Sequence, residues 1–434
     1  MKKVLILPLI LALAALAFLL AMSKGTEIQL DPEVTVVGIE TPIKLKLLNT
    51  HGVYRVAAFL EQEGRRHKVF EAEEPRNSFL FLREVRPPKV LQFTVGTKQA
   101  PEVKEGTAKL IISAQSNDLR GKTDERVFDV NVVTKPPVLS VDNLQHYINQ
   151  GGSELVTFKV SGHWTEAGVR VGKYTFRSFP LGKDRNERFS LFAFPWDVPA
   201  DTVPVVYAKN SGTEVTSRFW FKVFPKKFRS RELALDDSFL QKVVNQIDPT
   251  GSGDLLQRFL KINGEMRHQN NRKLSDLRLK TEERFLWNGP FLQLANSKVE
   301  SQFADTRTYV YQGKKVDQQT HLGFDLSVTQ NVDVAAANDG KVILAENLGI
   351  YGNCVVLDHG YGLQSIYAHL SQINVKPGDM VKKLQTIGKS GATGLAGGDH
   401  LHFSMQVDGV QVNPVEWWDG HWIQDRILSK LPKQ

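Results

Sequence analysis

Histidine is concentrated near the end of this chain, with a spacing that suits metal chemistry. Six of the eleven histidines among the 434 residues occur from residue 321 onward: His321, His359, His369, His400, His402 and His421. A catalytic zinc usually takes three protein ligands from His, Asp, Glu or Cys and leaves one position open for water. His321, Asp325 and one member of the His400/His402 pair would supply that set. The sequence therefore predicts a zinc site in this region.

These short motifs place demands on the backbone. In a straight strand His321 and Asp325 would share one face about 13 Å apart, at about 3.3 Å per residue. Two ligands of one ion each lie about 2 Å from it, so the chain must bend between them. Gly323, at the midpoint, permits the backbone angles of such a bend. His400 and His402 would share one face of a strand about 7 Å apart, so one can bind the metal while the other acts as an acid or base.

The segment from about Phe291 to Trp418 resembles the lysostaphin-type (LytM-like) zinc endopeptidases of bacterial cell walls. The matching stretches are Asn296–Val299, His321–Leu326, Asp339–Val342, Tyr351–Asn353, Asp358–Gly360, Tyr367–Leu370, Val375–Asp379, Gly388–Gly391, Thr393–Gly394, His400–Phe403 and Asn413–Pro414. The resemblance implies that His321, Asp325 and His402 are the zinc ligands and that His369 and His400 are the catalytic pair beside them. It also implies a compact antiparallel β core, open at one end where a peptide lies across the metal.

By this resemblance the protein is expected to hydrolyse amide bonds in peptidoglycan peptide cross-links with one Zn2+ per chain. Zinc lowers the pKa of a bound water to about 7 and polarises the amide carbonyl. No H-E-x-x-H motif supplies a glutamate base, so histidine is the natural proton carrier. We expect His400 to act as general base and His369 to stabilise the transition state, or the reverse. The scissile bond stays open between a diaminopimelate-type stem cross-link, which the upstream layout favours, a glycine bridge and a protein substrate.

Two other interpretations of this segment are a binding module and a carrier domain. A metal-free binding module that activates another cell-wall hydrolase would be expected to lack ligands, yet all five polar positions are present. A lipoyl- or biotinyl-type carrier domain would suit Val375–Asp379. Such a domain needs a lysine on an acidic or Met-flanked hairpin, and none is evident in the sequence. The other candidate residues are interpreted as structural. We expect Cys354, the one cysteine, to be a small buried side chain, His359 to lie in a turn, and His268 and His421 to lie on the surface.

The rest of the chain is expected to be mainly β. Short apolar runs between polar and Gly/Pro breaks indicate two β-sandwich-like domains, and the aromatic residues of the second are interpreted as core rather than as a sugar-binding strip. Apolar residues from Leu233 onward recur at helical spacing, with a break at Pro249–Gly253. The expected order is a β-sandwich-like domain at 27–135, a second at 136–224, a short helical connector at 225–285, the antiparallel β peptidase core at 286–423 and a tail at 424–434.

The N-terminus suggests a membrane address. Lys2 and Lys3 precede an uncharged, mostly apolar run of 19 residues from Val4 to Met22. A spanning helix needs about 20 residues, whereas the apolar region of a signal peptide has about 7–15. Residues 1–23 are therefore expected to be a transmembrane anchor, with a signal peptide as the alternative. The preceding lysines favour an exported protein in the cytoplasmic (inner) membrane, with a single pass and the bulk of the chain in the periplasm.

The formal net charge of +8 is unevenly distributed. Residues 286–434 contain 12 Lys and Arg against 14 Asp and Glu, a net charge of −2, so the other 285 residues carry 43 against 33, a net charge of +10. No nucleic-acid-reading motif accompanies the basic charge, and we expect no nucleic-acid partner. The basic stretch from Leu233 to Phe285 directly precedes the acidic core. We expect it to cover part of the zinc cleft until a regulatory envelope protein or the wall displaces it, with a rigid spacer as the alternative.

Overall fold

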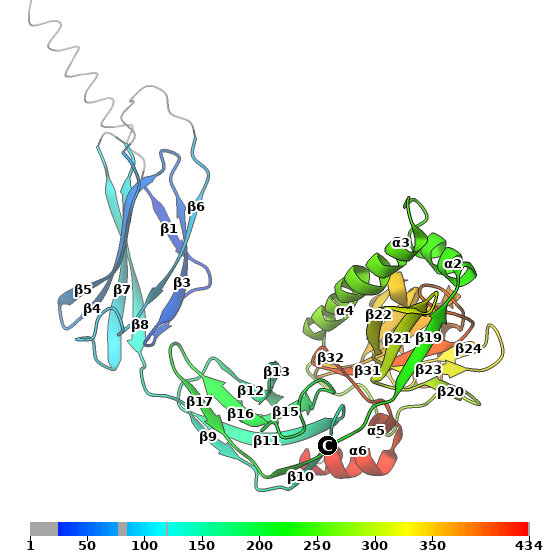
Figure 1. The fold of residues 1–434 in the computed structure, drawn as a ribbon. Helices are drawn as coiled ribbons and strands as arrows, with labels where there is room; N and C mark the ends of the chain where they lie inside the picture. Colours follow the sequence, from blue (N-terminus) through cyan, green and yellow to red (C-terminus); the bar gives the residue numbers. More distant parts are fainter. Residues whose placement is uncertain (1–24, 77–84, 119, 433–434) are drawn as a thin grey trace, which may run out of the picture. The chain divides into compact units, whose positions relative to one another are not determined.

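The computed structural model describes residues 25–76, 85–118 and 120–432. The chain forms two compact units. One holds the residues up to Val138 with Ser161–Glu166 and Ala208–Val215, and the other holds Leu139–Val160, Ala167–Tyr207 and the chain from Thr216 onward. Strands dominate both units, with helices mainly near the peptidase-like region (Figure 1), so the predicted mainly-β fold class is confirmed.

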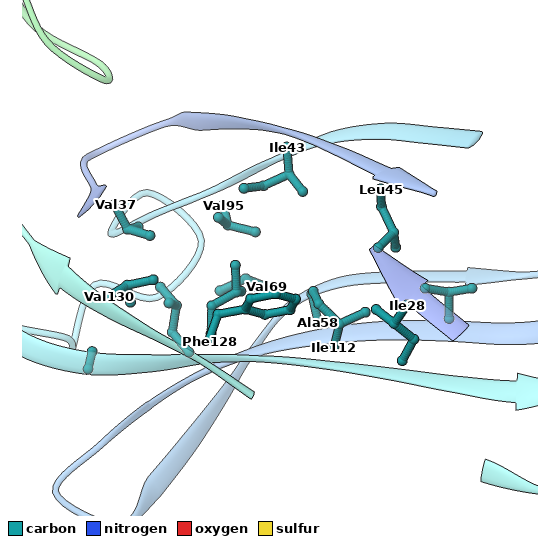
Figure 2. Packing of buried hydrophobic residues seen from close by; sticks show 14 of the residues in the cluster. Ile28, Val37, Ile43, Leu45, Ala58, Val69, Val95, Ile112, Phe128 and Val130 are labelled. Carbon is teal, nitrogen blue, oxygen red and sulfur yellow. The ribbon is translucent and has the colours of Figure 1, made fainter. Parts of the chain in front are cut away.

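The N-terminal unit contains two sheets around an apolar core. Their strand orders are β2-β8-β7-β4-β5 and β1-β3-β6. The strands are β1 (Glu27–Leu30), β2 (Val36–Val37), β3 (Thr41–Leu48), β4 (Val53–Gln62), β5 (Arg65–Glu73), β6 (Lys89–Val95), β7 (Gly106–Ser116) and β8 (Thr123–Val132). Along β3, Ile43, Leu45 and Leu47 are at most 2% exposed, because alternate residues of a strand face the core. Figure 2 shows side chains of both sheets meeting in this core.

A second β region follows. It has two four-stranded sheets, β14-β15-β11-β9 and β13-β12-β16-β17, and a parallel pair, β10-β18. The strands are β9 (Val138–Val141), β10 (His146–Asn149), β11 (Ser153–Ser161), β12 (Glu166–Val171), β13 (Tyr174–Arg177), β14 (Phe179–Pro180), β15 (Glu187–Ala193), β16 (Val205–Lys209), β17 (Glu214–Ser217) and β18 (Phe221–Phe224). Phe176, Phe189, Phe192 and Phe194 are at most 2% exposed, which confirms the core interpretation for these aromatics, whereas Trp220 is 46% exposed.

The helical segment begins later than expected. Ser230–Leu235 form strand β19, which pairs in parallel with β21 (Asp305–Tyr311), so the prediction that the helical pattern starts at Leu233 is wrong. Leu233 and Leu235 are two residues apart and fit a strand equally well, and the available partner strand decided between the two. The first helix of this segment, α2 (Asp237–Ile247), starts where the Asp236 carboxylate accepts a hydrogen bond from the N–H of Phe239 (2.7 Å).

The rest of the segment is helical after the predicted break. It comprises α3 (Leu255–Lys261), the π-helical turn η1 (Ile262–Met266), α4 (Arg267–Asp276) and the 3-10 turn η2 (Leu277–Leu279). Buried Leu240, Val244 and Phe259 share one apolar cluster with Leu344 and Ile366 of the following domain. The helices are therefore part of that domain's packing.

The C-terminal domain is built on one large antiparallel sheet, with the order β20-β23-β31-β27-β26-β25-β29 and β32 paired to β31. Smaller sheets, β19-β21-β22 and β24-β30-β28, complete it. The strands are β20 (Lys298–Ser301), β22 (Lys314–His321), β23 (Phe324–Ser327), β24 (Asp333–Ala335), β25 (Gly340–Asn347), β26 (Asn353–Asp358), β27 (Leu363–Leu370), β28 (Gln372–Ile373), β29 (Met380–Val381), β30 (Thr386–Lys389), β31 (Leu401–Val407) and β32 (Val410–Val412). A 3-10 turn, η3 (Gly349–Tyr351), precedes β26.

Two short helices follow β32 in the described part of the chain. α5 (Val415–Trp418) and α6 (Gly420–Arg426) are followed by the 3-10 turn η4 (Leu428–Lys430). Lys430 Nζ lies 2.6 Å from Glu154 Oε1 of β11 and 2.9 Å from the carbonyl oxygen of Leu155. The residues expected to form a tail thus bind the second β region.

No helix within residues 25–76, 85–118 and 120–432 is long and apolar enough to cross a membrane. This finding contradicts the expected localisation as a single-pass protein of the cytoplasmic membrane, and we withdraw it. The apolar run Val4–Met22, on which that expectation rested, lies outside the described residues.

Candidate metal centre

Three strands from two sheets bring the predicted ligands together. His321 is the last residue of β22, and Asp325 lies in β23 after a short bend. His402 lies in β31, directly opposite Asp325 in the antiparallel pairing of β23 with β31. The chain leaves one sheet at His321 and enters the other at Phe324, which supplies the bend that the spacing required.

The ligand atoms of these residues form a compact triangle. His321 Nε2 lies 3.0 Å from Asp325 Oδ1 and 2.9 Å from His402 Nδ1, and the latter two atoms are 3.1 Å apart. Three ligands about 2.0 Å from one tetrahedral ion would be about 3.3 Å apart. The donor set and its spacing therefore fit a zinc ion. We call His321, Asp325 and His402 the metal cluster.

The other polar atoms of the metal cluster are held by the protein. His321 Nδ1 lies 3.0 Å from the carbonyl oxygen of Gln302, and His402 Nε2 lies 3.1 Å from Ser404 Oγ. Such outer contacts fix the orientation of a ligating imidazole and leave its second nitrogen for the metal. The remaining Asp325 oxygen, Oδ2, accepts a hydrogen bond from Arg307 Nη2 (2.5 Å). Every member of the cluster is thus oriented toward the common point.

Gly323 serves this site in a different way from the one predicted. Its φ angle is not in the left-handed region, so the bend does not depend on the conformational freedom of glycine. A Cβ atom at this position would instead lie 2.7 Å from His402 Nε2 and 2.4 Å from Ser404 Oγ. Gly323 is needed because the backbone passes directly against a ligand.

His369 and His400 lie beside the metal cluster. Their ring centroids are 4.8 Å apart, and His400 Nε2 lies 3.4 Å from Asp325 Oδ1. His369 Nδ1 lies 2.8 Å from the carbonyl oxygen of Thr393, and His400 Nδ1 lies 2.9 Å from that of Gly398. Donation from each Nδ1 leaves Nε2 as the nitrogen that can exchange a proton. His369 also has a φ of 62°, a strained conformation that functional sites often hold.

Burial and mutual charge set the protonation of the cluster. Burial lowers the pKa of His321 to about 4, and it lowers the pKa of His402 although Asp325 opposes the change. Burial favours the protonated form of Asp325, but the surrounding histidines hold its pKa well below the usual range. Two neutral imidazoles and one carboxylate are therefore presented at neutral pH, which is the protonation state that metal binding requires.

The two neighbouring histidines differ from each other. Burial lowers the pKa of His369 well below its usual value, and His400 and His402 add to this effect. Burial also acts against protonation of His400, but its hydrogen bond to Asp325, the negative charge of that carboxylate and the carbonyl oxygen of Gly398 together outweigh burial and raise the pKa.

The remaining candidate residues have the structural roles expected of them. His359 is fully buried, with its Nδ1 2.7 Å from the carbonyl oxygen of Asp339 and its Nε2 2.7 Å from Ser365 Oγ. Cys354 is fully buried, and burial raises the pKa of its thiol. His268 and His421 are exposed.

Sequence analysis did not identify Arg307 as part of the site. It lies in β21, and its guanidinium supplies the positive charge that compensates Asp325. Neither spacing nor residue type marks it, because its role depends on the contact between β21 and β23. An arginine in a strand near two ligands would have been the only hint.

The helical segment touches the surroundings of the site without a described contact to its ligands. Lys242 Nζ lies 3.3 Å from the carbonyl oxygen of Gly397, in the loop before His400. Tyr351 donates a hydrogen bond to Asn271 Oδ1 (2.8 Å), and its ring lies 5.6 Å from that of His402. Coverage of the cleft by this segment stays a prediction.

Comparison with known proteins locates the similarity in this domain. Residues 319–414 match the model of peptidase family M23. An uncharacterized metalloprotease of Haemophilus influenzae is 39% identical over 120 residues, which are 27% of this chain and 25% of that protein. Stage II sporulation protein Q of Bacillus subtilis is 39% identical over 101 residues, 22% of this chain and 36% of that protein. Peptidoglycan DD-endopeptidase ShyA of Vibrio cholerae is 40% identical over 96 residues, 22% of each chain.

The aligned residues are a minor part of each of these proteins. This chain covers between 22% and 36% of the length of these three relatives. The family match therefore concerns the domain that contains the metal cluster.

Proposed function

We propose, on the premise that residues 319–414 form a domain of peptidase family M23, that this protein is a zinc-dependent endopeptidase acting on peptidoglycan peptide cross-links. The observation that carries the proposal is the triangle of His321 Nε2, Asp325 Oδ1 and His402 Nδ1, with edges of 2.9–3.1 Å, beside a second pair of histidines. Burying a carboxylate and two imidazoles costs free energy of folding, unless a bound cation compensates the charge or the group serves a reaction.

Each residue has a proposed role in hydrolysis. His321, Asp325 and His402 hold the ion, and Arg307 fixes the Asp325 carboxylate. Zinc bound there would acidify a water molecule and polarise the amide carbonyl of the substrate. His400 Nε2 takes the proton from the attacking water and delivers it to the leaving amine, while His369 stabilises the charge that develops on the substrate oxygen. The two histidines share the same anchoring through Nδ1, so the exchanged assignment has equal geometric support.

The substrate class rests on the relatives. One protein that is similar over this domain is named a peptidoglycan DD-endopeptidase. A stem-peptide cross-link in peptidoglycan is accordingly the proposed substrate.

A metal-free binding module is the alternative. One relative is named as a sporulation protein rather than as a peptidase, so similarity over this domain does not by itself imply hydrolysis. The presence of all five polar residues in one group, four of them buried, favours the enzyme.

The test combines metal content and hydrolysis on one preparation of the full chain. We expect about one zinc per chain by elemental analysis, and cleavage of purified cross-linked muropeptides into products that mass spectrometry identifies. Removing the metal with a chelator should stop cleavage, and added Zn2+ should restore it. A chain that holds no zinc and leaves every cross-link intact would support the binding module. A chain with zinc that leaves muropeptides intact but cleaves other peptides would refute the substrate class alone.

A further inference from the structure

The small sheet β19-β21-β22 contacts the large sheet in matching strand order. Arg231 of β19 donates a hydrogen bond from Nη1 to the carbonyl oxygen of Glu300 in β20 (2.7 Å). Arg307 of β21 donates to Asp325 of β23 (2.5 Å), and His321 Nε2 of β22 lies 2.9 Å from His402 Nδ1 of β31. Three successive strands of the small sheet thus contact β20, β23 and β31, which are successive strands of the large sheet. Figure 1 shows β19, β21 and β22 side by side.

The large sheet continues beyond this overlap. The strand after β31 is β27, which carries His369, and Ala368 of β27 is paired with His402. Across residues 25–76, 85–118 and 120–432, the only strand paired with β22 is β21. A fourth strand beside β22 would therefore meet β27 near His369.

The backbone polarity of β22 can be read from its neighbours. The N–H of Thr306 donates to the carbonyl oxygen of Arg229, on the β19 side, so the backbone groups of Thr306 face away from β22. Successive residues of a strand alternate in direction, so those of Arg307 face β22 and its partner Gln319. The N–H and C=O groups of Gln318 and Thr320 consequently point away from β21, along the free edge.

These edge groups are mostly unengaged. The N–H of Gln318 donates to Asp317 Oδ1 (2.7 Å), whereas the N–H and C=O of Thr320 have no partner within the described part of the chain. Asn263 of η1 donates to Asp317 Oδ2 (2.7 Å), which is where the helical segment reaches β22. The stretch between that contact and the metal cluster is Gln318–His321, roughly 10 Å long at about 3.3 Å per residue.

We propose that the edge of β22 at Gln318 and Thr320 binds the substrate as an added β-strand, through backbone hydrogen bonds. The inference rests on the proposed function and specifies how its substrate is held. An added strand lies about 4.8 Å from β22, which places the peptide between His321 on one side and His369 and His400 on the other. Main-chain pairing of this kind provides affinity with little dependence on side chains. An extended peptide backbone with free N–H and C=O groups is thus the recognised chemistry.

The key variant is Thr320→Pro. Proline is tolerated on an edge where its N–H would face outward, because no ladder hydrogen bond is lost. It removes the outward donor and places a ring where the substrate backbone would pair. We expect a roughly tenfold rise in KM and in the Kd for cross-linked muropeptide, the upper end of what one hydrogen bond contributes. The comparison variant, Thr320→Ala, keeps the N–H, so its KM and Kd should rise less than those of Thr320→Pro.

A second measurement does not depend on that variant folding. Cross-linked peptides that are N-methylated at one amide at a time should lose affinity for the wild-type chain at alternate positions, because only every second residue faces β22. A Thr320→Pro chain that retains zinc and binds the muropeptide as the wild type does would overturn the proposal. If that variant fails to hold zinc, equal sensitivity at all N-methylated positions would overturn it.

Binding and hydrolysis are read separately so that the two proposals can be distinguished. A wild-type chain that binds muropeptides with the alternating pattern, yet does not cleave them, would refute the proposed function and leave the β22 edge as a binding site. A wild-type chain that cleaves them with no dependence on Thr320→Pro or on alternate amides would refute the edge alone. No binding by the wild type would refute both.

Discussion

Two buried polar groups in the C-terminal unit differ in what lies at their centre. In the metal cluster, one carboxylate and two imidazoles converge on a common point, and the nearest protein cation, Arg307, contacts the outer oxygen of Asp325. In the other group, which we call the lysine cluster, Glu154 Oε1 and His146 Nδ1 converge on Lys430 Nζ at 2.6 Å and 3.1 Å.

The difference separates a candidate site from a structural contact. The side chain of Lys430 is 5% exposed and that of Glu154 is fully buried, so the chain itself provides the cation that a buried carboxylate requires. The metal cluster lacks such a group at its centre. Residue types alone do not distinguish the two clusters, since both combine histidine with acidic residues. The position of the protein's own cation does.

The largest expected effect is on the metal cluster. His321→Ala, Asp325→Ala and His402→Ala should each lose most of the bound zinc and all measurable cleavage of muropeptides, because each removes one of three ligands. Elemental analysis and cleavage assays on the same preparations test this. The control is His359→Ala, a buried histidine outside the cluster, which should keep its zinc if it folds. Near-stoichiometric zinc in all three variants would refute the assignment.

The neighbouring histidines should separate catalysis from metal binding. His369→Ala and His400→Ala are expected to keep zinc but to lower kcat by roughly 10²–10⁴-fold, the usual contribution of acid–base catalysis. If His400→Ala loses zinc while His402→Ala retains it, the roles of those two residues are interchanged.

The lysine cluster should affect stability without affecting the metal. Lys430→Met leaves Glu154 buried without its cation, so we expect the free energy of unfolding to fall by about 3–5 kcal/mol, with unchanged zinc content. Denaturant unfolding followed by tryptophan fluorescence measures this. Lys382→Met is the matched control, because Lys382 is 83% exposed beside Asp339 and such a pair contributes about 1 kcal/mol or less. Equal effects of both variants would remove the distinction between a buried and a surface pair.

Loss of Arg307 should weaken zinc binding at the metal cluster without abolishing it. Arg307→Gln removes the charge beside Asp325, and we expect zinc affinity to fall about 10–100-fold, as for other groups that orient a ligand. Competition with a chromophoric chelator measures the affinity. Lys298→Gln, which alters an exposed ion pair with Glu300, should leave zinc affinity unchanged.

The smallest effect concerns pH. Burial raises the pKa of Glu416 to about 7, although the carboxylate accepts hydrogen bonds from Asn149 and from the N–H of Ser153. Because the folded pKa lies above the unfolded value, the stabilisation from Glu416 is complete below pH 4.5 and is lost as pH rises through 7. We expect unfolding free energy to fall by about 1 kcal/mol between pH 6 and 8. Glu416→Gln should remove that fall, and an unchanged pH profile in the variant would contradict the assignment.

The sequence by itself determined the mainly-β composition and the set of histidines and aspartate around which the candidate site forms. These features are local: apolar alternation marks strands, and the ligand types stand close together in short motifs. The spacing of His321 and Asp325 even required a bend, which the chain makes by passing from one sheet to another. The same local reasoning misread Leu233 and Leu235, because short apolar spacing fits a strand and a helix alike.

Only the tertiary structure decided the contacts between residues distant in sequence. Arg307 meets Asp325 because the fold brings β21 against β23, and Gly323 is required because His402 fills the space where its Cβ would be. Lys430 becomes a structural cation rather than a tail residue because β11 brings Glu154 to it. Each of these depends on strand pairing and packing across scores of residues, and no local pattern encodes which strand lies beside which.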